Sequence, residues 1–110
     1  MLLYHGTSRK QSWKIKRDGF KQFNGLFGNG VYFTSSLEGA LIFGDYIISV
    51  EVPHETISFY SFLQWQARYP EEESWAEIML HDQCPGIAIE YESGEIEVCM
   101  YDAKLIRIVN

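Results

Sequence analysis

Short apolar runs in the first part of the chain predict a strand followed by a helix. Leu2–His5 is an apolar run that ends at a glycine, which is typical of a buried strand. Ser8 has a glutamine three residues later, as in a capping box, and Gly19 stands where a helix C-terminus is expected. We therefore expect a helix between these two residues, with Trp13 and Ile15 as its apolar contacts.

The pattern then changes to glycine-rich sequence and short β-branched runs. Residues 21–30 hold three glycines and two asparagines, which predicts a turn-rich loop. Residues 31–34 and 46–52 are apolar or β-branched and predict strands, and residues 56–59 predict another short strand. Between the first two, Ser35 or Ser36 is placed to cap a short helix.

The second part of the chain predicts helices and then strands. Residues 61–81 have helical character interrupted at Pro70, and Trp75, Ile78 and Met79 form an apolar stripe at helical spacing, which predicts core packing. Residues 86–90 and 96–101 flank a turn and predict a hairpin, and residues 105–109 predict a last strand. The length of 110 residues predicts a single domain spanning residues 1–110.

Composition and charge narrow the class of protein. Hydrophobic residues make up 46% of the chain and aromatic residues 15%, which excludes a disordered segment. The net charge of -6 argues against a dedicated nucleic-acid binder, although most basic residues cluster near the N-terminus, where they suit either a phosphate-bearing ligand or a solvated helix face. They are Arg9, Lys10, Lys14, Lys16, Arg17 and Lys21. No run of about 18 apolar residues predicts a membrane span, and no signal segment is present, so we expect a cytoplasmic protein with reduced cysteines.

Three strand segments carry polar or aromatic residues where apolar ones are expected. They read YHGTS at 4–8, GNGVYFT at 28–34 and EIEVCMYD at 95–102. In this order, and over nearly the whole chain, the set resembles the signature strands of ADP-ribosyltransferases of the poly(ADP-ribose) polymerase-like, His-Tyr-Glu branch. The resemblance implies an α+β fold with two small, mostly antiparallel sheets packed face to face around a cleft for NAD, with flanking helices.

The resemblance also implies a role for each signature residue. His5 would bind the adenosine-side ribose of NAD, and Gly6 and Thr7 complete the first motif, with the Gly6 backbone reaching the nicotinamide carboxamide. Tyr32 would stack on the nicotinamide ring. Glu97 would accept a hydrogen bond from the ribose 2′-hydroxyl and place negative charge beside the oxocarbenium-like centre.

Three further positions follow from the same resemblance. The family serine that holds the carboxamide aligns with Gly39 or Ala40, so Ser36 is the nearest serine, and Phe43 is the candidate for a second aromatic on the ring. Glu95 with Glu97 resembles the Glu-x-Glu pair of arginine-modifying relatives, in which the first glutamate orients the incoming guanidinium; the alternative is that Glu95 is an exposed turn residue after Gly94.

The resemblance implies an NAD-dependent mono-ADP-ribosyltransferase. The absence of an attached regulatory or DNA-binding module favours transfer of one unit to an acceptor, expected to be a protein, and fits a toxin or phage effector. Alternatives are a non-catalytic NAD- or ADP-ribose-binding module, and an RNA 2′-phosphotransferase, which shares the fold but carries histidine and arginine on the second strand, where this chain has Tyr32. A metal site is not predicted, because His54, His81, Cys84 and Cys99 lack a recognised ligand spacing.

Overall fold

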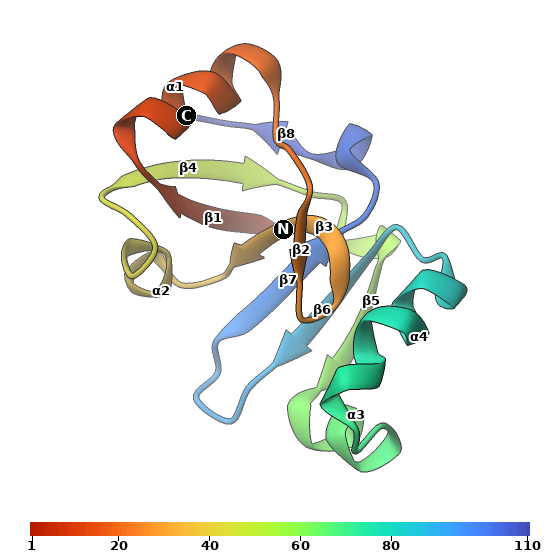
Figure 1. Ribbon diagram of the computed structural model, residues 1–110. Coiled ribbons are helices and arrows are strands. Elements are labelled where there is room, and N and C mark those ends of the chain that lie inside the picture. Colours follow the sequence, from red (N-terminus) through yellow and green to blue (C-terminus); the bar gives the residue numbers. More distant parts are fainter.

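Strands and short helices alternate along the chain. The computed structural model describes residues 1–110 (Figure 1). The strands are β1 (Leu2–Thr7), β2 (Phe23–Gly25), β3 (Gly28–Thr34), β4 (Tyr46–Glu51), β5 (Ile57–Ser61), β6 (Gly86–Glu90), β7 (Ile96–Met100) and β8 (Arg107–Ile108). The α-helices are α1 (Arg9–Asp18), α2 (Leu37–Leu41), α3 (Phe62–Arg68) and α4 (Trp75–Asp82), and three 3-10 turns cover His54–Thr56, Glu72–Ser74 and Ala103–Leu105.

The sheet is nearly divided at its centre. The strand order is β5-β6-β7-β3-β1-β4-β8, with β2 added to β3 outside that order. β1 pairs with β4 over six residues but meets β3 only at Tyr4 opposite Thr34. β5 and β6 are the parallel pair, and the α3–α4 segment lies in the connection between them. All other pairs are antiparallel.

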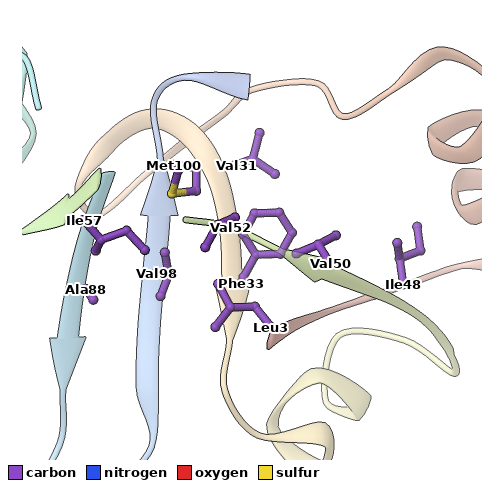
Figure 2. Close-up of a cluster of buried hydrophobic side chains, with 10 residues drawn as sticks. All are labelled: Leu3, Val31, Phe33, Ile48, Val50, Val52, Ile57, Ala88, Val98 and Met100. Carbon is purple, nitrogen blue, oxygen red and sulfur yellow. The ribbon is translucent and has the colours of Figure 1, made fainter. Parts of the chain in front are cut away.

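The α+β class predicted from the sequence is confirmed, and one detail of the arrangement differs. Two separate sheets were expected, whereas the Tyr4–Thr34 pair joins both halves into one eight-stranded mixed sheet. Side chains from both halves fill the main core (Figure 2). Its buried members are Leu3, Val31, Phe33, Ile48, Val50, Val52, Ile57, Ala88, Val98 and Met100.

A second core lies where α3 and α4 cover the β5–β6–β7 half. Trp65 and Trp75 are both 2% exposed, and they pack around Phe27 with edge-to-face and stacked ring contacts. Met79 completes the stripe predicted on α4, and Ile78 is partly buried beside it. None of the helices is long and apolar enough to cross a membrane.

The start of α1 agrees with the sequence, whereas the role of Trp13 does not. The Ser8 hydroxyl accepts from the Gln11 N–H at 3.2 Å, and Gly19 ends the helix at a φ of 87° that favours glycine. Trp13 is 62% exposed, so the prediction that it packs inward is wrong. Ser12 is buried in its place, because α1 lies with this small residue and Ile15 toward the protein.

The glycine-rich segment is also more ordered than predicted. Residues 21–30 were expected to form a loop, but β2 and the start of β3 pair as a hairpin, with Phe23 opposite Gly30 and Gly25 opposite Gly28. The glycines are needed for packing. A Cβ on Gly25 would lie 2.6 Å from Tyr32 Cζ, and a Cβ on Gly30 would lie 2.4 Å from Cys99 Sγ.

Candidate functional site

The β3–β7 pairing places four of the polar and aromatic side chains on one face of the sheet. Thr34 stands opposite Glu97, and Tyr32 stands opposite Cys99. Directly opposed residues of antiparallel strands share a face, and alternate residues of one strand do so too. Tyr32, Thr34, Glu97 and Cys99 therefore lie on the same side, away from the main core shown in Figure 2.

Glu97 is a partly buried carboxylate without a positively charged partner. The Tyr91 hydroxyl donates to Glu97 Oε1 at 3.0 Å. The ion pairs of the protein lie elsewhere, at Arg17–Asp18 and Arg107–Glu51. Burial raises the pKa of Glu97, the Tyr91 hydrogen bond opposes this, and the charge of Glu95 adds to the rise. Glu97 is thus a carboxylate whose charge is incompletely compensated within the protein.

Tyr32 holds the turn between β2 and β3 with its hydroxyl group. That hydroxyl accepts from the Phe27 N–H at 3.0 Å and donates to the Gly28 carbonyl at 2.7 Å. Its ring meets Phe23 edge to face, with centroids 6.1 Å apart. Burial is the main cause that raises the pKa of Tyr32. The hydroxyl donates its only proton within the turn, so the ring is the main part of this residue that remains for a ligand.

His5 bridges β1 and β3 where the two strands separate. Its Nδ1 lies 2.9 Å from the Tyr32 carbonyl oxygen, which only accepts, so Nδ1 carries the proton and Nε2 is the free ring nitrogen. The imidazole ring lies edge to face with Phe20 and Phe33, with centroids 5.2 and 5.8 Å away. Backbone pairing between β1 and β3 is limited to Tyr4. The hydrogen bond from the His5 side chain to the Tyr32 carbonyl therefore extends the contact between β1 and β3 beyond that one backbone pair.

Helix α2 occupies the side-chain side of Gly6. A Cβ on Gly6 would lie 1.7 Å from the carbonyl oxygen of Ala40, so the backbone of α2 rests directly on this glycine. Gly6 and Thr7 also pair with Ile47 and Tyr46 of β4. β3 forms no backbone pair with Gly6, so this edge of β1 is unpaired at Gly6.

Ser36 and Phe43 lie at the two ends of helix α2. Ser36 caps α2, and its hydroxyl accepts from the Gly39 N–H at 3.0 Å. Phe43 follows the end of α2, is 76% exposed and makes no ring contact with Tyr32. Phe43 therefore stays a candidate for the second aromatic on the nicotinamide ring, placed just beyond the end of α2 at Leu41.

Glu95 points back to the sheet. The Thr34 hydroxyl donates to Glu95 Oε1 at 2.6 Å, and a Cβ on Gly39 would lie 2.2 Å from the same oxygen. Thr34 and Tyr91 are the two contact residues that sequence reasoning missed. The hairpin register offered a signal for Tyr91, because pairing Ile89 with Glu97 places Tyr91 and Glu97 on one face of neighbouring strands.

Two of the pockets on the molecule lie away from these residues. The first, about 720 Å³, lies between the β2–β3 hairpin and α4, and its lining includes Asn24, Asn29, Gln83 and Tyr101. The second, about 540 Å³, lies beside the 3-10 turn at His54–Thr56. Neither is lined by His5, Tyr32 or Glu97.

The remaining reactive groups are not arranged for thiolate or metal chemistry. Cys84 and Cys99 are unpaired, and burial raises the pKa of each thiol to about 11, so both stay protonated at neutral pH. No three His, Cys, Asp or Glu side chains converge on a point where a metal ion would fit. The polar face around Glu97 is therefore the main chemical feature of the fold.

Comparison with known proteins supports the fold alone. No protein-family model matches the chain, and no curated protein matches it. Among solved structures, the chain is similar to one described as the crystal structure of an anti-CRISPR protein. The similarity covers 99% of this chain and 95% of that chain, with a TM-score of 0.51 and 14% sequence identity. The whole α+β arrangement thus occurs in another protein of nearly the same extent.

Proposed function

We propose that this protein is a mono-ADP-ribosyltransferase that transfers one ADP-ribose unit from NAD to an acceptor, expected to be a protein side chain. The proposal rests on the His-Tyr-Glu resemblance, and one observation carries it. Glu97 is a partly buried carboxylate with a single hydroxyl donor and no cation within an ion-pair distance. Such a group is costly for stability, and costly arrangements concentrate at functional sites.

The uncompensated charge of Glu97 suits the reaction chemically. In the transfer, the bond between the ribose C1′ and the nicotinamide nitrogen breaks, and its electron pair leaves with neutral nicotinamide. The ribose becomes cationic until the acceptor nucleophile adds to C1′ and loses its proton to solvent. A carboxylate that lacks a cation of its own stabilises this developing positive charge more than it stabilises the ground state.

His5 and Tyr32 would hold NAD where β1 and β3 separate. The free Nε2 of His5 can accept a hydrogen bond from a ribose hydroxyl, because Nδ1 is already engaged by the Tyr32 carbonyl. The Tyr32 ring is fixed by its two hydroxyl hydrogen bonds and offers a rigid surface for the nicotinamide. The Gly6 backbone would complete this site from the strand edge.

Glu95 would act on the acceptor. Thr34 binds one oxygen of its carboxylate and fixes its orientation beside Glu97. The second oxygen then remains for a guanidinium group, which suits an arginine acceptor. The expected setting is that of a cytoplasmic effector, phage-encoded or toxin-like.

A non-catalytic binding module of the same fold is the second candidate. One observation favours it: the pocket of about 720 Å³ between the β2–β3 hairpin and α4 could hold a ligand away from His5, Tyr32 and Glu97. Such a module would bind NAD or ADP-ribose without breaking the glycosidic bond.

NAD labelled in its nicotinamide and adenosine parts distinguishes these candidates. The purified protein is incubated with it, alone, with agmatine as a small guanidinium acceptor, and with cell lysate. The proposal predicts release of nicotinamide and a labelled agmatine or protein product carrying one ADP-ribose unit. NAD binding without release of nicotinamide in any of the three incubations supports the module, and a ladder of products contradicts transfer of a single unit.

A further inference from the structure

Charge is strongly segregated along this chain. Residues 1–21 carry six Lys or Arg and one Asp, whereas the remaining residues carry three Lys or Arg and fourteen Asp or Glu. Five of the six N-terminal cations lie on the ten-residue helix α1. Helix α1 is therefore strongly basic, although the net charge of the whole protein is negative.

The exposed face of α1 places a tryptophan among these cations. Trp13 is 62% exposed, and residues three and four positions away on a helix are its surface neighbours. Those neighbours are Arg9, Lys10, Lys16 and Arg17. The Arg17 guanidinium lies 4.5 Å from the Trp13 ring centroid, so one face of the ring already contacts a cation.

This arrangement costs helix stability in two ways. Arg9 and Lys10 stand in the first turn, which holds no acidic residue and where the helix dipole disfavours positive charge. Lys10 and Lys14 repel each other one turn apart. Arg17 pairs with Asp18, and the other cations of the helix form no ion pair. An anionic ligand would relieve both costs.

We propose that the exposed face of α1 binds single-stranded nucleic acid, with a base stacked on Trp13 and phosphates on the surrounding Arg and Lys side chains. An aromatic ring among cations is the combination that binds single strands without sequence preference. A lipid surface suits α1 less well, because its apolar side, Ile15, packs against the core of the protein.

The acidic remainder of the molecule does not prevent this binding. The molecule extends 38 × 28 × 25 Å, whereas charges in physiological salt are screened over about 8 to 10 Å. A nucleic acid that binds at α1 therefore interacts mainly with the charges of this basic face. This inference does not rest on the proposed transferase activity.

Binding of end-labelled dT12 and rU12 to the full chain, followed by fluorescence anisotropy, tests the inference. We expect micromolar affinity at 50 mM NaCl. Contacts from Arg9, Lys10, Lys14 and Lys16 to phosphates would lower the affinity about 50-fold at 200 mM NaCl, from a single-strand slope of about 0.7 per phosphate. Trp65 and Trp75 are buried, so quenching of tryptophan emission reports on Trp13.

Two α1 variants and one matched control complete the design. Trp13→Leu should weaken binding about tenfold, the effect of losing one stacked base. The double variant K10Q/K14Q should reduce the salt slope by about 1.4. Arg68→Gln removes another exposed cation that lies over an aromatic ring, 5.3 Å from the Tyr69 centroid. This variant should change neither the affinity for the oligonucleotide nor the salt slope.

Three results would overturn the inference. One is the absence of binding to both oligonucleotides at 50 mM NaCl. Another is equal affinity of the wild-type chain, Trp13→Leu and K10Q/K14Q, with circular dichroism confirming that all are folded. The third is equally tight binding of poly-glutamate, which would assign the face to acidic proteins.

Discussion

Replacing Gly6 with alanine tests how the first motif is built into the fold. The added Cβ would lie 1.7 Å from the Ala40 carbonyl oxygen and 2.7 Å from its carbonyl carbon. Ordinary contacts of this kind begin at about 3.4 Å, so α2 has to move by roughly 1.5 Å or more, because a backbone carbonyl cannot rotate away. Overpacking of this severity costs about 3 kcal/mol.

The cost translates into a measurable melting temperature. An unfolding entropy of about 2.1 cal/mol/K per residue gives about 0.23 kcal/mol/K for 110 residues, so Gly6→Ala should melt about 13 °C below the wild type. Gly19→Ala is the control, because a Cβ there meets nothing within 4 Å and only the positive φ is unfavourable, which costs about 1 kcal/mol. If calorimetry finds that Gly6→Ala melts within 2 °C of the wild type, the direct contact of the α2 backbone with Gly6 of β1 is refuted.

Three other substitutions test the surroundings of the site. Thr34→Val removes the hydroxyl that donates to Glu95 at 2.6 Å. The free energy of unfolding should fall by about 2 kcal/mol, which lowers the melting temperature by about 9 °C. An unchanged melting temperature would mean that this hydrogen bond is absent in solution. Tyr101→Phe removes a 2.6 Å donor to the buried Phe27 carbonyl and should cost about 1 to 2 kcal/mol in denaturant unfolding, and a neutral result would contradict this contact. Glu97 has a raised pKa in the folded state, so ionisation of this carboxyl destabilises the fold as the pH rises through that pKa. Glu97→Gln should therefore melt at a higher temperature than the wild type at pH 8, and the difference should shrink toward about pH 4. A difference in melting temperature that grows on acidification would mean that the pKa of Glu97 is lowered and not raised.

Local sequence signals predicted the elements that depend on local chemistry. The start and end of α1 follow from Ser8 and Gly19, and the hairpin of β6 and β7 follows from its turn. The β2–β3 hairpin was missed because glycine is read as a loop former. Here Gly25 and Gly30 leave room for the Tyr32 ring and Cys99 Sγ, which is a tertiary requirement.

The site was predicted as a set of strand residues, and its contacts were not. A strand pattern places Tyr32 and Glu97 on a sheet, but the sheet register decides that Glu97 faces Thr34. The Thr34–Glu95 hydrogen bond joins residues 61 positions apart, and no local pattern indicates it.

The central claim is that Glu97 stabilises the cationic ribose as nicotinamide leaves. The most direct measurement is the initial rate of nicotinamide release from NAD for the wild type, Glu97→Gln and Glu90→Gln, the last being an exposed glutamate on the neighbouring strand β6. We predict at least about a 100-fold lower rate for Glu97→Gln, from the loss of one charge-stabilising group, with its fold retained, and an unchanged rate for Glu90→Gln. Equal rates for the wild type and Glu97→Gln would contradict the claim.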